Sequence, residues 1–193
     1  MTELLIDKVW ISIVLCLVLS IMEHYLGLYE VYLYYNHVNA YMIFEGRCDG
    51  YERFIEPGNR KWIPSTSFMV VLAILSLGIY AGWFALVKQF GRPEIFSFLV
   101  GGIILYRATR SLIHFRMISF FRFAQDPGEI QGKVKYSRRL TFTLPYLDLY
   151  GFTLLYLLLF FIQGSWFLLG GILTCFIAAR RHRDWVMVKT YRD

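Results

Sequence analysis

The chain has 193 residues, of which 57% are hydrophobic and 19% are aromatic. A soluble domain of this size could not keep that much apolar surface away from water, so we expect one transmembrane domain over residues 1–193. The formal net charge is +6, but the basic residues flank apolar runs and form no separate arm. We therefore expect contact with the lipid bilayer and its anionic headgroups, and not with nucleic acid.

The pattern predicts an all-α bundle of about five transmembrane helices, with four as the alternative. The run from Ile63 to Val87 carries no charge and exceeds the roughly 20 residues that a helix needs to cross a bilayer. Pro93 and Glu94 favour a helix start. The run after Leu140 is long enough for two crossings, and Gly164 indicates a hairpin between them. The predicted spans are 9–29, 63–87, 95–113, 141–162 and 165–181.

The basic residues predict how the bundle is oriented. Fifteen Lys and Arg residues fall in or next to the loop segments 30–62, 114–140 and 182–193, whereas three fall on the opposite side of the membrane. Because cytoplasmic loops carry an excess of Lys and Arg, these segments are predicted to be cytoplasmic. The N-terminus is then outside and the C-terminus is inside, and the plasma membrane is the expected location.

Several charged or titratable side chains fall inside the predicted spans or at their ends. They are Glu23, His24, Arg107, Arg110, His114 and Asp148. At about 1.5 Å of rise per residue, the two acids and the two arginines share one layer roughly 20 Å from the outer face. A central charge costs about 2.5 to 3.5 kcal/mol to insert, so the layer needs an explanation.

Three interpretations of this charged layer remain open. In the first, Glu23 and Asp148 neutralise the two arginines in a structural clasp between helices. In the second, the layer lines a polar cavity that binds an ion, a proton or an anionic headgroup. In the third, a different helix register lets the arginines extend to the cytoplasmic surface.

Two further groups of residues suggest contacts at the helix surfaces. Gly78 and Gly82 have the GxxxG spacing that lets helices pack closely, either within the chain or between copies of it. The alternative is that they are small residues that occur by chance in an apolar helix. A basic cluster before the fourth span is a candidate for binding lipid headgroups, or else an ordinary flank of a membrane span. It consists of Lys133, Lys135, Arg138 and Arg139.

The sequence contains no metalloprotease, nucleophile-elbow, phosphate-loop or paired-cysteine motif, so no catalytic residue, metal or cofactor is predicted. The prediction is therefore a noncatalytic multi-pass membrane component, a sensor, scaffold or complex subunit that assembles with itself or with partner proteins. One alternative is a small ion channel or an ion- or proton-coupled transporter that uses the charged layer. The other is a lipid-modifying membrane enzyme.

Overall fold

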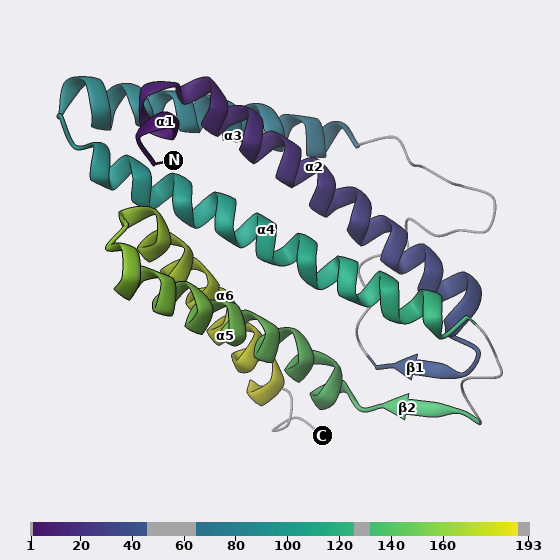
Figure 1. The fold of residues 1–193 in the computed structure, drawn as a ribbon. Coiled ribbons are helices and arrows are strands. Elements are labelled where there is room, and N and C mark those ends of the chain that lie inside the picture. The colour runs from purple at the N-terminus through teal and green to yellow at the C-terminus, as the bar shows by residue number, and fades with distance from the viewer. Residues whose placement is uncertain (1, 46–64, 126–131, 189–193) are drawn as a thin grey trace.

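A computed structural model describes residues 2–45, 65–125 and 132–188 of the chain (Figure 1). Six helices account for most of these residues: α1 (Thr2–Asp7), α2 (Val9–Leu33), α3 (Thr66–Trp83), α4 (Pro93–Phe123), α5 (Arg138–Gln163) and α6 (Trp166–Val188). Two π-helical segments extend α2 and α3, namely η1 (Tyr34–Val38) and η3 (Phe84–Gln89). The chain places α4 in the middle, with α2 and α3 on one side and α5 and α6 on the other (Figure 1).

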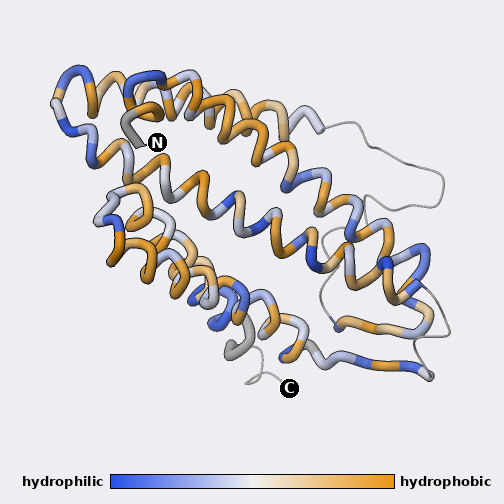
Figure 2. The backbone as a smooth tube through the Cα atoms, viewed as in Figure 1, coloured by the Kyte–Doolittle hydropathy of each residue, from blue (hydrophilic) through white to orange (hydrophobic). Residues whose placement is uncertain are grey.

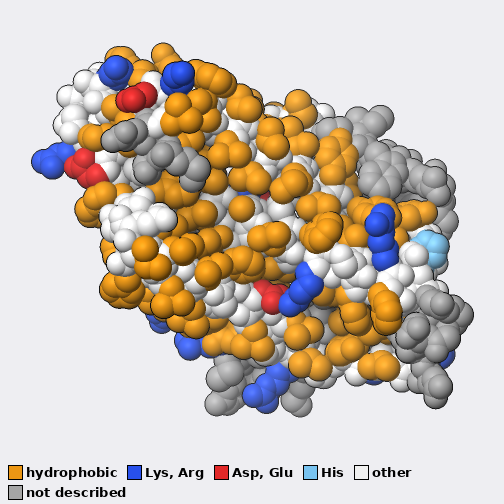
Figure 3. All heavy atoms as spheres, in the orientation of Figure 1, with side chains coloured by type: hydrophobic (Ala, Val, Ile, Leu, Met, Phe, Trp, Pro, Cys, Tyr) orange, Lys and Arg blue, Asp and Glu red, His pale blue; other side chains and the backbone are white. Residues whose placement is uncertain are grey.

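Four helical segments are long and apolar enough to cross a membrane, by length and composition. Within the described ranges they are Val9–Val38, Thr66–Gln89, Pro93–Phe123 and Arg139–Gln163. Hydrophobic side chains cover most of the long face in Figure 3, and hydrophobic stretches run along the helices in Figure 2. The molecule is thus a helical bundle suited to a bilayer, while the number of crossings stays a prediction because α6 also contains Arg180, Arg181 and Arg183.

Local sequence determines where these helices begin and end. Pro93 occupies the first turn of α4, as predicted. The hydroxyl oxygens of Ser65 and Ser137 accept backbone N–H bonds of 3.2 and 3.4 Å from the first turns of α3 and α5. Gly164 has a left-handed φ of 61° and donates its N–H to the Phe160 carbonyl at 2.7 Å, which ends α5 and confirms the predicted hairpin.

Two helices continue well past the ends of their predicted spans. The first predicted span ends at residue 29, but α2 continues to Leu33 and then into η1. The third predicted span ends at residue 113, but α4 continues to Phe123 without a break. Parts of the predicted cytoplasmic segments 30–62 and 114–140 are therefore helical extensions of the bundle. Residues 46–64, 126–131 and 189–193 lie outside the described ranges, and they include parts of all three predicted cytoplasmic segments, 30–62, 114–140 and 182–193.

Close packing of glycines joins α4 to α6. A Cβ atom added to Gly101 would lie 2.7 Å from the backbone carbon of Phe167, and one added to Gly102 would lie 2.6 Å from Thr174 Oγ1. On α6, Gly170 faces Gly102, and the backbone of Phe167 faces Gly101. The pair of Gly102 and Gly170, together with Gly101, therefore lets the two backbones meet.

Gly78 and Gly82, the glycines that the sequence singled out, make no such contact within the chain. A Cβ atom at either position would meet no atom within 4 Å. The close glycine packing inside the chain thus joins α4 and α6 and does not involve these two residues of α3. The GxxxG spacing identified small residues on α3, but spacing alone does not show which helix faces them.

A short two-stranded parallel sheet accompanies the predicted all-α bundle. In this sheet β1 (Met42–Phe44) pairs with β2 (Val134–Tyr136), and the stacked rings of Phe44 and Tyr136 have centroids 4.4 Å apart. Side chains from η1 and from the end of α4, among them Tyr34 and Phe121, pack against the sheet in one aromatic cluster. Three-residue strands are too short to show an alternating pattern, so the sequence gives no signal for them.

We expect Gly170→Ala to destabilise the protein and Gly78→Ala to leave its stability unchanged or slightly higher. The added methyl group at position 170 would overlap the Phe98 carbonyl of α4, whereas position 78 has open space. Overpacking of this kind costs about 1 to 3 kcal/mol. Thermal unfolding of both variants in detergent measures the difference, and equal melting temperatures would contradict the close approach of α4 and α6.

Candidate functional site

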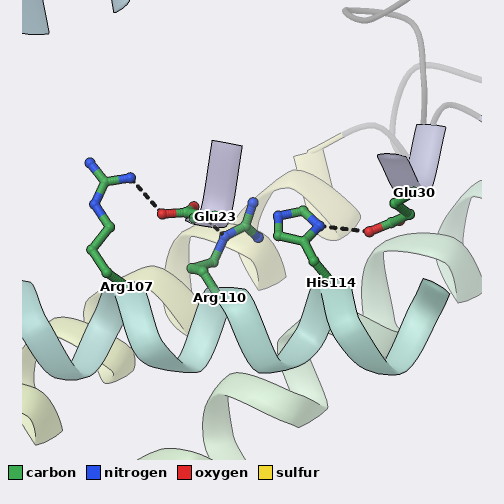
Figure 4. A network of polar contacts seen from close by, with 5 residues as sticks. All are labelled: Glu23, Glu30, Arg107, Arg110 and His114. Atoms are coloured by element: carbon green, nitrogen blue, oxygen red, sulfur yellow. Dashed lines mark hydrogen bonds and ion pairs between the residues drawn. The ribbon is translucent and has the colours of Figure 1, made fainter. Parts of the chain in front are cut away.

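Glu23 of α2 contacts both arginines of α4, as the clasp interpretation predicted for this acid (Figure 4). Arg107 Nη1 donates to Glu23 Oε2 at 2.6 Å, and Arg110 Nε donates to Glu23 Oε1 at 3.3 Å. The side chain of Glu23 is 13% exposed, and those of the arginines are 32% and 23% exposed. One largely buried carboxylate thus bridges two cations near the middle of the bundle.

A second pair, His114 with Glu30, continues this contact along the same two helices. His114 Nδ1 lies 2.6 Å from Glu30 Oε2, and Glu30 is buried (Figure 4). Sequence reasoning assigned Glu30 to the cytoplasmic segment 30–62 and missed this pair, because it ended the span at residue 29. The sequence separation could have indicated this pair, because Glu30 and His114 are 84 residues apart, as are Glu23 and Arg107.

Asp148 does not join the two arginines, and this part of the predicted clasp is wrong. Arg116 Nη1 donates to Asp148 Oδ1 at 2.5 Å. Arg116 follows Arg107 by about two and a half helical turns, so it lies on the opposite side of α4. Sequence reasoning placed Arg116 in the cytoplasmic segment 114–140 and therefore did not consider it as a partner. The continuation of α4 to Phe123 brings Arg116 into the bundle.

His24 lies beside the clasp but packs on α3. Its ring stacks on the ring of Phe68, with centroids 4.1 Å apart and planes inclined by 16°. His24 is the residue of α2 that follows Glu23, and both line one cavity. The imidazole therefore helps to join α3 to the α2–α4 pair.

The cavity beside the clasp has a volume of about 240 Å³ and lies among α2, α3 and α4. Its lining combines charged, polar and apolar side chains, namely Ser20, Glu23, His24, Gly27, Phe68, Val71, Arg107, Arg110 and His114. Such a lining is suited to binding an anion or ordered water, and the neighbouring apolar residues lower the local dielectric.

The predicted headgroup cluster lies at the sheet and at the start of α5. Lys135 Nζ forms a 2.6 Å ion pair with Glu45, while Lys133 and Arg139 are exposed. The side chain of Arg138 lies outside the described part of the structure. Binding of lipid headgroups by this cluster stays a prediction. Across the described ranges, no group of three His, Cys, Asp or Glu side chains could hold a metal ion.

Comparison of this chain with known protein families, with characterised proteins and with solved structures finds no match. The functional argument therefore rests on the geometry of the charged groups and their surroundings.

We expect Glu23→Gln to lower the free energy of unfolding by about 3 kcal/mol, the low end of the cost of removing one partner from a buried ion pair. The change leaves two cations without their carboxylate. Arg110→Ala should cost less, because Arg107 still neutralises Glu23. Thermal unfolding in detergent tests this order, with the exposed Arg139→Gln as the control. A Glu23→Gln variant as stable as Arg139→Gln would show that the acid contributes no pairing energy.

Proposed function

We propose that this protein is a noncatalytic multi-pass membrane component, a sensor, scaffold or complex subunit organised around α4. One observation carries the proposal. In the described ranges, the three acids within α2 and α5, Glu23, Glu30 and Asp148, each contact a basic side chain of α4. Charges in direct contact with one another hold helices in register, which is a structural role.

The same pairing speaks against an ion-conducting path. Conduction needs a series of sites that bind an ion weakly enough to release it. Here the clasp at Glu23 and the pair of Asp148 with Arg116 lie on opposite sides of α4, and they border two separate cavities. The polar groups thus form two separate sets on opposite sides of α4, with the pair of Glu30 and His114 next to the clasp and Asp148 paired with Arg116 on the other side.

Assembly with a second copy or with a partner helix is supported by the unused surface of α3. Gly78 and Gly82 border an apolar cavity of about 510 Å³ between α3 and α4. Ile74 and Leu77, on the same helix, are 64% and 68% exposed. Small residues flanked by exposed apolar side chains suit the close approach of another membrane helix. The proposal therefore places the contact with a partner at α3.

The proposed topology has five spans, with the N-terminus outside and the C-terminus in the cytoplasm of a cell bounded by its plasma membrane. Figure 1 shows α1 at the end of the bundle that also holds the α5–α6 hairpin, and both strands at the other end. From that hairpin, α6 runs back along α5 toward the end that holds the strands. The C-terminal end of α6 therefore lies away from α1, which agrees with an odd number of crossings. Among the described basic residues, Arg122 in the last turn of α4 and Lys135 in β2 then lie at the end with the sheet.

We expect single cysteines at Thr2→Cys and Asp193→Cys to be labelled from opposite sides of the membrane. The experiment uses intact cells or spheroplasts, a reagent that cannot cross the membrane, and a background in which Cys16, Cys48 and Cys175 are replaced by alanine. The external reagent should label position 2 alone, and position 193 should react only after lysis. Labelling of both positions from one side would contradict the five-span topology.

We expect wild-type protein in liposomes to conduct no more ions than protein-free liposomes. The reason is that the charged groups are bound to one another and line no continuous path. Flux of K⁺, Cl⁻ and H⁺ is followed with ion-sensitive dyes, and an added ionophore confirms that the vesicles are sealed. A reproducible flux that Glu23→Gln abolishes would overturn the proposal and establish the channel alternative.

A further inference from the structure

We propose that the cavity among α2, α3 and α4 binds a phosphate group, held by Arg107, Arg110 and the hydroxyl of Ser20. This adds a ligand to the proposed membrane component and does not depend on whether the component is a sensor, a scaffold or a subunit. Three separate observations support the site: an excess of positive charge, unused hydrogen-bond donors and a buried hydroxyl without a partner.

The charge at the clasp is unbalanced. Arg107 and Arg110 together carry two positive charges, and both contact the single carboxylate of Glu23. The next acid along α2, Glu30, contacts His114 and neither arginine. One positive charge at the clasp therefore has no acidic partner among the described residues. Such a charge is costly at this depth, and a bound anion would offset the cost.

The two arginines also have hydrogen-bond donors to spare. A guanidinium group has five N–H donors in a planar fork that matches the oxygens of a phosphate group. In the described part of the chain, Arg107 uses Nη1 and Arg110 uses Nε, each toward Glu23. Both Nη atoms of Arg110 and the Nη2 atom of Arg107 are thus available. Both side chains line the cavity in which the ligand would bind.

Ser20 supplies the independent observation. It lines the same cavity and is 2% exposed, yet its Oγ has no hydrogen-bond partner in the described ranges. Several other helical hydroxyls of this chain bond to the carbonyl four residues earlier, as Ser76 does to Leu72 at 2.9 Å and Thr153 does to Leu149 at 2.8 Å, whereas Ser97 and Ser111 resemble Ser20 in making no such bond. A buried hydroxyl without a hydrogen bond is energetically unfavourable unless another group, such as a bound ligand, forms a hydrogen bond with it.

The size and surroundings of the cavity agree with this ligand. About 240 Å³ is far more than the roughly 30 Å³ that one water molecule occupies in the liquid. Phe68 and Val71 of α3 form an apolar wall, which strengthens a charge-assisted hydrogen bond by excluding water. The phosphate group can belong to a lipid headgroup that enters from the bilayer or to a free phosphate ion from water, and these two sources bind through the same chemistry.

The experiment measures thermal unfolding of the full-length, delipidated protein in a neutral detergent. Inorganic phosphate is added in one series, and phosphatidic acid in mixed micelles is added in another, with phosphatidylcholine as the reference lipid. At a concentration about tenfold above Kd, we expect Tm to rise by about 3 °C or more. A rise with both additives identifies a site open to water, and a rise with phosphatidic acid alone identifies a lipid headgroup. Either result supports the site.

Matched variants separate this cavity from other places where an anion could bind. Ser20→Ala and Ser111→Ala each remove a buried hydroxyl without a partner, but only Ser20 lines the cavity. Neither change should destabilise the ligand-free protein, and only Ser20→Ala should reduce the rise in Tm. Arg107→Gln should abolish most of the rise, whereas the exposed Lys133→Gln should retain it.

Two results would overturn the proposal. The first is the absence of any rise in Tm with either additive. The second is a rise that stays unchanged in both Ser20→Ala and Arg107→Gln, which would place the bound anion elsewhere. Both readouts are independent of ion flux, so they distinguish failure of this site from failure of the noncatalytic role.

Discussion

The structure depends on a strongly basic helix that lies in the middle of an apolar bundle. In α4, Arg107, Arg110, His114 and Arg116 follow one another within less than three turns. A bilayer does not solvate such side chains, so each needs an acid or a polar group from a neighbouring helix. The helices that supply acids, α2 and α5, are consequently fixed against α4 in one register.

This requirement explains why α2 and α5 lie on opposite sides of α4 (Figure 2). The first three basic residues point from one face and meet the acids of α2, while Arg116 points the other way and meets Asp148. The glycine contact between α4 and α6 adds shape complementarity where no charge is present. By contrast, α3 contributes no acid, and it meets the charged site only through Phe68 and Val71.

The sequence was informative where a signal is local and failed where it depends on a neighbour. Pro93 and Gly164 marked the start of a helix and a hairpin because their effect is on their own backbone. Counting residues along the predicted spans also placed Glu23 at the same depth as the two arginines, which it contacts in the structure. The partner of Asp148 could not be found in this way, because counting residues gives depth and not the side of a helix. Because two spans were ended too early, Glu30 and Arg116 were assigned to cytoplasmic segments and were not considered as partners.

The pairing of Arg116 with Asp148 has a consequence for biosynthesis. A chain made from its N-terminus can present Glu23 to α4 as soon as α4 enters the membrane, because α2 has already been made. Asp148 emerges from the ribosome only later. Until α5 has been made, Arg116 lacks this partner and is expected at the edge of the bundle or in the interfacial region. Release of the nascent chain between these two points would leave this arginine without its counter-ion, which is costly at the depth of the membrane.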